Sequence, residues 1–115
     1  MHDTIIDQQE LMERIGGDME LLEELLELFE EDYPELLASI QHAIEIQDGE
    51  SLKRSAHTLK GAVGNFAALK AHALAFELEK KGEAGDFSDA STLLTQLESA
   101  IHEFKDALKA LAPSV

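Results

Sequence analysis

Apolar positions along this chain recur at intervals of three and four residues, and no stretch alternates apolar and polar residues as a half-buried strand does. Such spacing gives an α-helix one apolar face. The pattern predicts six helical segments, at residues 4–15, 18–32, 34–47, 50–66, 69–81 and 88–111. Pro34 leaves two interpretations open, because proline fits the first turn of a helix and also kinks a longer helix that continues through it.

Glycine-containing and polar breaks separate these segments and supply their caps. Two adjacent glycines end the first segment, and Asp18 can cap the second. Asp48 begins a turn before the fourth segment, residues 82–86 are expected to form a loop, and Ser88 can cap the last helix. Connections this short favour antiparallel packing of neighbouring helices.

The helix order predicts an all-α fold, an antiparallel up-and-down four-helix bundle with additional short N-terminal helices. A chain of 115 residues is large enough to bury its own core, so we expect one domain over residues 1–115. Within the fifth segment, the residues considered for the core face are Leu69, Ala73 and Phe76, with Leu74 and Leu78 as further candidates. Six large apolar residues are predicted to be buried: Leu52, Leu59, Phe66, Phe76, Leu97 and Phe104.

Composition excludes several classes of protein. The chain has no cysteine, which rules out disulfides, thiolate metal sites and a cysteine nucleophile. Its net charge is −15, so its surface would repel nucleic acid. The first residues lack the basic and apolar regions of a secretion signal, and no stretch is long and apolar enough to span a bilayer. We therefore expect a cytoplasmic protein with neither a nucleic acid nor a membrane as partner.

One face of the predicted helix at 50–66 carries candidate chemistry. A histidine points outward, a lysine follows one turn later, and two glycines complete the same face: His57, Lys60, Gly61 and Gly64. The opposite face is an apolar stripe. Glycine inside a helix costs about 1 kcal/mol relative to alanine, so two glycines beside one histidine suggest that a partner approaches the backbone there.

The same region is the one basic stretch of an acidic chain. Residues 51–70 contain Lys53, Arg54, Lys60 and Lys70 and no acidic residue, so this window carries +4 and the rest of the chain carries −19. Such a run is commonly only a solvated helix face. Its coincidence with an exposed histidine favours an acidic or phosphorylated partner.

Residues 56–66 resemble the signature of the histidine-containing phosphotransfer (HPt) domain, His-x-x-Lys-Gly followed by small residues. The similarity extends from about residue 4 to about residue 108, through Gly16-Gly17-Asp18, Asp48-Gly49 and Leu78-Glu79. The resemblance implies a four-helix-bundle phosphocarrier of multistep two-component phosphorelays. Its histidine accepts a phosphoryl group from an aspartyl phosphate on one receiver domain and passes it to the aspartate of another.

The resemblance also implies roles for single residues. His57 would be phosphorylated, and Lys60 would contact the phosphoryl oxygens. Glu79 would hydrogen-bond the nitrogen of the imidazole ring that does not attack, directly or through water. Gly61 and Gly64 would leave a flat surface for a receiver. Two basic side chains nearby would steer its approach: Lys53 and Arg54.

The chain departs from the family pattern at a few positions without touching the His–Lys–Gly face. Ala62 and Val63 stand where members often have serine or another small residue, and Ala67 stands where they often have glycine. We expect Val63 to be a packing variant on the core side of the helix. Ala67 adds only a methyl group at the helix end.

No cofactor is expected on this chain, and Mg²⁺ is expected only on the receiver partner. The chain has no glycine-rich phosphate loop, so ATP binding and self-phosphorylation are not expected. Its other histidines are scattered singly and none forms the paired Glu-x-x-His motif of a di-metal bundle. The expected partners are receiver domains and a hybrid sensor histidine kinase, with the protein itself a monomer.

Two alternatives stay open. The chain could be the substrate domain of a larger histidine kinase, phosphorylated by a kinase domain instead of a receiver. It could also be a helical adaptor whose basic face binds an acidic partner without chemistry. Phosphorylation of His57 would separate the adaptor from the relay protein.

Overall fold

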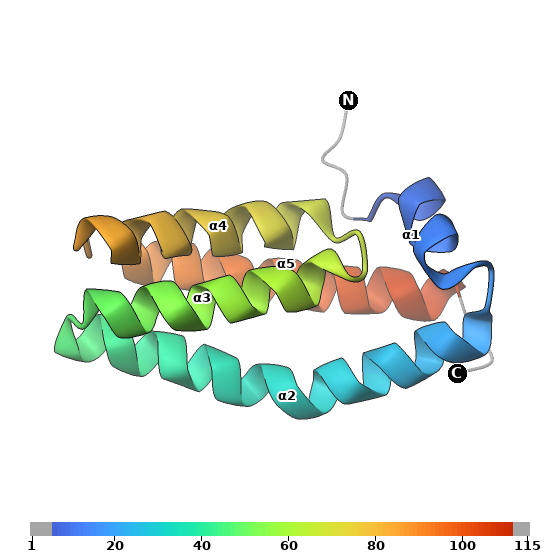
Figure 1. Cartoon of the computed structure of the whole chain (residues 1–115), viewed down its shortest axis with the longest axis horizontal. Helices are drawn as coiled ribbons and strands as arrows, with labels where there is room; N and C mark the ends of the chain where they lie inside the picture. The colour runs from blue at the N-terminus through green and yellow to red at the C-terminus, as the bar shows by residue number, and fades with distance from the viewer. Residues whose placement is uncertain (1–5, 112–115) are drawn as a thin grey trace.

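The computed structural model describes residues 6–111, and within that range it contains five α-helices and no strand. They are α1 (Gln8–Ile15), α2 (Met19–Ile46), α3 (Gly49–Gly64), α4 (Leu69–Ala84) and α5 (Ala90–Leu111). Helices α2 to α5 lie side by side and alternate in direction, while α1 sits at one end of the bundle (Figure 1). The predicted all-α bundle with short N-terminal helical cover is confirmed. Residues 4 and 5 of the predicted first segment lie outside the described range.

Helix α2 is one continuous helix through Pro34, which settles the choice between two segments and one. Asp18 caps it as predicted, because its side chain accepts hydrogen bonds from the backbone N–H groups of Glu20 and Leu21. The helix bends near its middle (Figure 1), where proline removes one intrahelical hydrogen bond. This helix of 28 residues packs against α3 and α5 and also contacts α1.

The helix caps predicted before α3 and before α5 are confirmed only for α3. The carboxylate of Asp48 accepts from the backbone N–H and the hydroxyl of Ser51, so α3 begins at a well-capped end. Before α5, the predicted cap by Ser88 is wrong. The carboxylate of Asp86 takes both the amide and the hydroxyl of Ser88, and α5 starts two residues later, at Ala90.

The turn between α3 and α4 contains a strained residue, Ala67, at a position where family members often have glycine. Ala67 has a φ of 54°, in the left-handed region where glycine has no steric cost. It is buried, and its carbonyl accepts a hydrogen bond from the amide of Asp7, 2.9 Å away. The strained turn therefore anchors the start of α1 to the end of the bundle.

The structure extends α4 beyond its predicted end, so the predicted loop at 82–86 is wrong in its first half. Helix α4 continues to Ala84 and ends at Gly85 in a left-handed conformation. Gly82 is an interior helical residue at which the α4 backbone meets α3. A Cβ atom on Gly82 would lie 2.5 Å from the backbone nitrogen of Lys53. Only glycine allows the two helices to approach this closely.

The core confirms five of the six predicted residues: Leu52, Leu59, Phe66, Leu97 and Phe104 are all buried. Phe76 is the exception, because it is 42% exposed. Helix α4 packs inward through a narrow face of small residues and one leucine: Ala71, Ala75, Leu78 and Gly82. Of the residues predicted for this face, Leu69, Ala73 and Phe76 are exposed, and Leu78 is buried.

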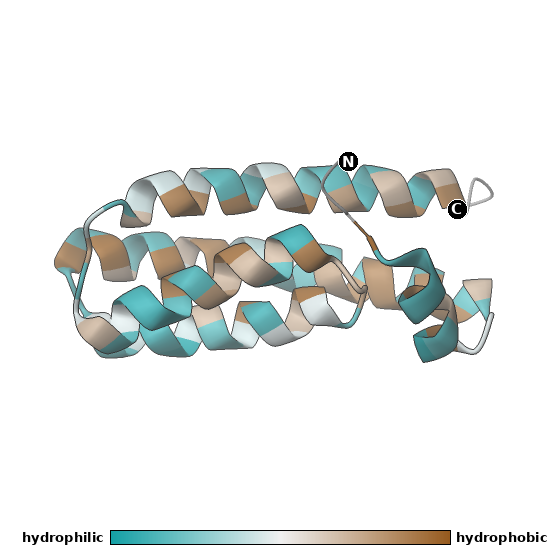
Figure 2. Cartoon of the chain, turned by 90° about the horizontal axis from the view of Figure 1, so that it is seen from above, coloured by the Kyte–Doolittle hydropathy of each residue, from teal (hydrophilic) through white to brown (hydrophobic). Residues whose placement is uncertain are grey.

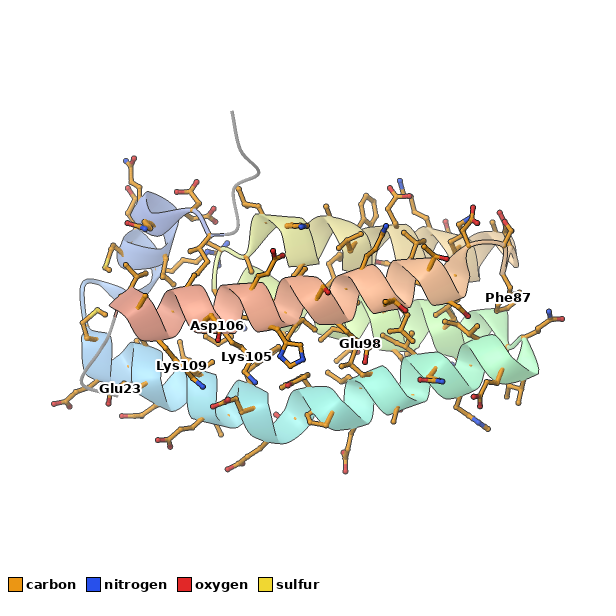
Figure 3. The ribbon with its side chains drawn as sticks, turned by 180° about the vertical axis from the view of Figure 1, so that it is seen from behind. Glu23, Phe87, Glu98, Lys105, Asp106 and Lys109 are labelled. Carbon is orange, nitrogen blue, oxygen red and sulfur yellow. The ribbon has the colours of Figure 1, made fainter. Side chains whose placement is uncertain are left out.

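Hydrophobic residues lie mostly on the sides of the helices that face one another and hydrophilic residues on the outer sides (Figure 2), and the buried side chains are apolar. Four aromatic rings pack together in the half of the core nearest α1: Phe29, Tyr33, Phe66 and Phe104. On the back of the molecule, Lys105 and Lys109 of α5 extend toward α2 (Figure 3). Their ammonium groups lie 3.1 Å and 3.8 Å from the carboxylate of Glu30, which ties α5 to α2.

Candidate functional site

His57 lies near the middle of α3 and faces outward, because the opposite side of that helix packs into the core. The α3 residues that face inward are completely buried: Leu52, Ala56, Leu59 and Val63. This arrangement turns the imidazole of His57 outward, with 65% of its side chain exposed. A partner can therefore reach the ring without any rearrangement of the bundle.

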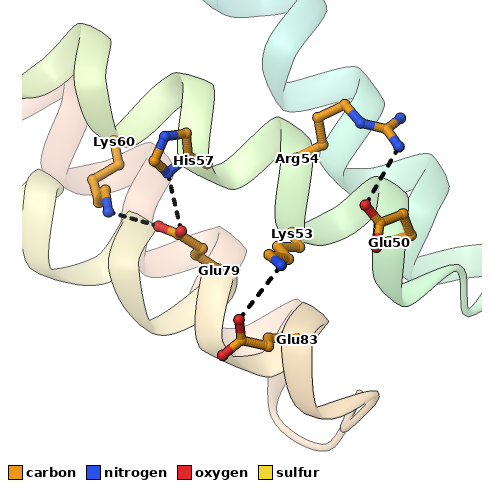
Figure 4. Close-up of polar contacts among 7 residues, drawn as sticks. All are labelled: Glu50, Lys53, Arg54, His57, Lys60, Glu79 and Glu83. Carbon is orange, nitrogen blue, oxygen red and sulfur yellow. Dashed lines mark hydrogen bonds and ion pairs between the residues drawn. The ribbon is translucent and has the colours of Figure 1, made fainter.

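A hydrogen bond across the α3–α4 interface fixes the orientation of that ring. The Nδ1 atom of His57 lies 3.0 Å from Oε2 of Glu79 (Figure 4). A carboxylate can only accept, so Nδ1 carries the proton when the imidazole is neutral. Nε2 then keeps its lone pair, which makes it the nucleophilic nitrogen of the ring.

Glu79 is held between two basic groups. The ammonium of Lys60 lies 2.8 Å from Oε1, while His57 binds Oε2 (Figure 4). Lys60 is the main cause that lowers the pKa of the Glu79 carboxyl below its usual value; burial opposes it, and the His57 hydrogen bond adds a smaller lowering effect. Glu79 is therefore ionised near neutral pH, as an acceptor for Nδ1–H must be.

The contact of Oε1 with Lys60 is ionic more than directional. Oε1 is buried, and among residues 6–111 no group gives it a hydrogen bond of good geometry, although the Lys60 ammonium is close. The same ammonium lies 4.8 Å from the ring centroid of Phe76. Lys60 thus rests between a carboxylate and an aromatic face.

The two glycines on the histidine face differ in their surroundings. A Cβ atom on Gly61 would meet nothing within 4 Å, so the surface beside His57 is open there. A Cβ atom on Gly64 would lie 3.4 Å from Cδ2 of His72, which already borders that position. Gly61 therefore matches the predicted flat surface better than Gly64 does.

The basic window of the sequence does not form a free positive patch. Lys53 pairs with Glu83 at 3.4 Å, and Arg54 pairs with Glu50 at 3.6 Å (Figure 4). Lys70 likewise lies 3.2 Å from a carboxylate, that of Glu103. The charges that surround His57 are consequently offset by carboxylates from α3, α4 and α5. A shallow depression beside the ring is lined by Glu50, Lys53, Arg54, His57, Thr58 and Glu79.

Of the α4 residues at this site, the sequence predicts Glu79 but not Phe76 or Glu83. The sequence places Phe76 in the core and does not predict its contact with Lys60. The sequence signal for an exposed Phe76 is the helical spacing of Ala71, Ala75 and Leu78. These residues form the inward face of α4, and Phe76 lies outside that face. Glu83, the partner of Lys53, was assigned to a loop.

The described residues contain neither a cluster of metal-ligating side chains nor a membrane-spanning helix. Within residues 6–111, no group of three or more histidine, aspartate or glutamate side chains could hold a metal ion. None of the five helices is long and apolar enough to cross a bilayer.

Comparisons with known proteins agree with this geometry. The family model described as the Hpt domain matches residues 24–111, which is well over half of the chain. The crystal structure of histidine-containing phosphotransfer protein B (HptB) from Pseudomonas aeruginosa PAO1 is similar to this fold, with a TM-score of 0.87. The two chains are 24% identical, and the match covers 99% of each. A search of curated proteins finds no match.

Proposed function

Because the chain belongs to the Hpt-domain family, whose members carry phosphoryl groups on histidine in phosphorelays, we propose that His57 is its phosphoryl acceptor. The observation that carries the proposal is the hydrogen bond from Nδ1 to Glu79, which leaves Nε2 free and unprotonated. His57 accepts the group from a receiver's aspartyl phosphate and passes it to the aspartate of another receiver. The protein acts as a carrier, and we place it in the cytoplasm as a monomer.

The transfer step follows from the protonation of the ring. Nε2 attacks phosphorus, the new N–P bond forms, and the bond between phosphorus and the receiver's aspartate oxygen breaks. The imidazole becomes positively charged during this step, because Nδ1 keeps its proton. The negative charge of Glu79 faces that proton and stabilises the phosphorylated ring. The reverse sequence returns the group to an aspartate, so one geometry serves both directions.

The other residues of the face position the partner. Gly61 leaves the surface beside Nε2 open, and Gly64 extends it along α3. Lys60 contributes positive charge within one turn of His57, either by holding Glu79 or by moving to the phosphoryl oxygens. The receiver supplies Mg²⁺ with its aspartate, so this chain needs no metal of its own. In-line positioning and charge neutralisation account for most of the catalysis in such transfers.

The test is phosphoryl transfer from receiver domains to the parent protein and to His57→Gln. Receivers from the source organism are phosphorylated with acetyl phosphate and mixed with each protein. We expect acid-labile, base-stable label on the parent and none on His57→Gln, with unchanged helical circular dichroism because the side chain is exposed. Label on His57→Gln would place the acceptor elsewhere. Label from a histidine kinase domain alone would favour the kinase-substrate alternative, and no label from either source would favour the adaptor.

A further inference from the structure

Phe76 is the one exposed phenylalanine among residues 6–111, and it lies beside the phosphotransfer site. Ammonium groups of Lys60 and Lys80 each lie 4.8 Å from its ring centroid. The same Lys60 ammonium is 2.8 Å from Glu79, which in turn binds His57. An unbroken series of contacts therefore runs from the imidazole on α3 to an exposed aromatic ring on α4.

We propose that Phe76, Lys60 and Lys80 form a second part of the docking face for receiver domains, which we name the α4 shelf. The inference rests on the proposed function, since the occupant is the receiver that exchanges phosphate with His57. It widens the docking face from the His57–Gly61–Gly64 stripe of α3 to both α3 and α4.

The chemistry of the α4 shelf fits that occupant. Aromatic residues are enriched in protein interfaces, where burial of the ring supplies contact area. The two lysines beside the ring add positive charge that complements acidic groups of a partner. A receiver's active site is built of carboxylates around its aspartate. Among residues 6–111, Lys80 forms an ion pair only with the exposed Glu77, at 2.9 Å, so its charge can be redirected to a partner at little cost. Elsewhere a chain of net charge −15 would repel such a partner.

A purely internal role for Phe76 makes a different prediction. If the ring served only to hold Lys60 against Glu79, its loss would change the reactivity of His57 toward any phosphoryl donor. If the ring contacts the receiver, its loss would change only reactions in which a receiver must dock. A small donor separates the two, because it needs no docking face.

The experiment compares Phe76→Ala with the parent and with Leu21→Ala. Leu21 is 37% exposed, similar to Phe76, and lies in the first turn of α2, whereas His57 lies in the middle of α3. Each protein is labelled in two ways, with phosphorylated receivers and with phosphoramidate. In the second reaction the N–P bond of phosphoramidate breaks, a new N–P bond forms at Nε2 of His57, and ammonia leaves.

We expect Phe76→Ala to raise the half-saturating receiver concentration about fivefold or more, the change typical of an interface anchor residue. Phosphoramidate labelling of the same protein should stay within about twofold of the parent, because the change in a weak exposed cation–π contact is small. Phe76→Leu should fall between the two, and Leu21→Ala should match the parent in both assays.

Two results would overturn the inference while leaving the proposed function intact. One is a normal half-saturating concentration for Phe76→Ala. The other is an equal loss in both assays, which would make Phe76 a support for Lys60 and nothing more. A parent protein that is labelled by phosphoramidate but by no receiver would instead overturn the proposed function, and the α4 shelf with it.

Discussion

Gly82 of α4 packs directly against the backbone of Lys53 in α3, so closely that a Cβ atom on Gly82 would lie 2.5 Å from the Lys53 nitrogen. The contact sets the distance between the two helices at one end of the site. Glu79 lies three residues before Gly82 on α4 and reaches across the same interface to His57. The close approach of the backbones therefore supports the hydrogen bond that orients the imidazole.

Gly82→Ala should accordingly destabilise the protein and loosen the site. The atoms nearest to the added Cβ are the backbone nitrogen of Lys53 and the carbonyl oxygen of Gly49. They cannot move easily because they belong to the α3 backbone, and overpacking of this kind costs about 1–3 kcal/mol. The free energy of unfolding, measured in urea, should fall by that amount. The matched control is Gly61→Ala, whose Cβ meets nothing within 4 Å and which should gain up to about 1 kcal/mol from better helix propensity. Equal stability of Gly82→Ala and the parent would contradict the packing argument.

The contrast between these glycines shows where sequence reasoning succeeded and where it failed. Periodicity predicted the helices, and the motif predicted that His57 faces outward from α3, which its exposed side chain confirms. The sequence predicts a loop at Gly82, since glycine disfavours helices. The sequence does not show that the backbone of another helix lies against this position, which is why glycine is needed inside α4. The sequence predicts that Phe76 is buried because its side chain is large and apolar. The inward face of α4 consists mainly of small residues instead, and Phe76 lies outside it.

The pairing of charges was also beyond the reach of sequence reasoning. Residues 51–70 contain no acidic residue, yet Lys53 and Lys60 each meet a carboxylate supplied by α4. Only the register of α3 against α4 decides which charges meet, and that register depends on small-residue packing. Glu79 was placed through family resemblance alone, since nothing in its own surroundings in the sequence distinguishes it from its neighbour Glu77.

Glu79→Gln should slow phosphoryl transfer while leaving the fold intact. Glutamine can still accept from Nδ1, but it lacks the charge that stabilises the positively charged ring. A hydrogen bond to a charged acceptor contributes roughly 1 kcal/mol more than one to a neutral acceptor, so we expect transfer to slow about fivefold. The ¹⁵N chemical shifts of the His57 ring should show a smaller fraction of the Nδ1–H tautomer. In Glu79→Ala, which removes the acceptor altogether, an unchanged tautomer ratio would show that Glu79 does not orient the ring.

The same variant predicts a pH dependence of stability with a defined sign. The pKa of Glu79 is lowered in the folded protein, chiefly by Lys60, so the ionised carboxylate stabilises the fold at pH values above the usual glutamate pKa. That contribution is lost as the pH falls from about 4.5 through the lower folded pKa. The stability difference between the parent and Glu79→Gln should therefore be largest near neutral pH and shrink in acid, as followed by urea unfolding at each pH.

Bulky substitutions of the surface glycines should harm docking more than folding. Gly61→Gln places a side chain in open space beside His57, where it would obstruct a receiver but no atom of this protein. We expect a slower transfer from receivers with a melting temperature equal to or above that of the parent. Gly64→Gln should raise the melting temperature less, because the Cβ atom that it adds would contact the ring of His72. A normal transfer rate for Gly61→Gln would show that this surface is not the contact face.

The basic residues around His57 should act at two different stages of transfer. Lys60 holds Glu79 and lies within one turn of the reacting ring, so Lys60→Ala should lower the rate even at saturating receiver. Lys53 and Arg54 are exposed, and their ion pairs with carboxylates are of the kind that contributes at most about 1 kcal/mol. Lys53→Ala and Arg54→Ala should therefore weaken encounter and leave the saturated rate unchanged.

Ionic strength offers a check on that division. The Debye length falls from about 10 Å at 0.1 M salt to about 3 Å at 1 M, so steering weakens as salt rises. Transfer at low receiver concentration should slow with salt in the parent and less so in Lys53→Ala and Arg54→Ala. The slope should be modest, because carboxylates from neighbouring helices offset these charges. Lys109→Ala on α5 is the matched control, an exposed lysine paired with Glu30 between α5 and α2, and it should behave as the parent does. If Lys53→Ala, Arg54→Ala and Lys60→Ala all match the parent at low salt, the basic residues are only a solvated helix face, and the receiver must find His57 through contacts that carry no net charge.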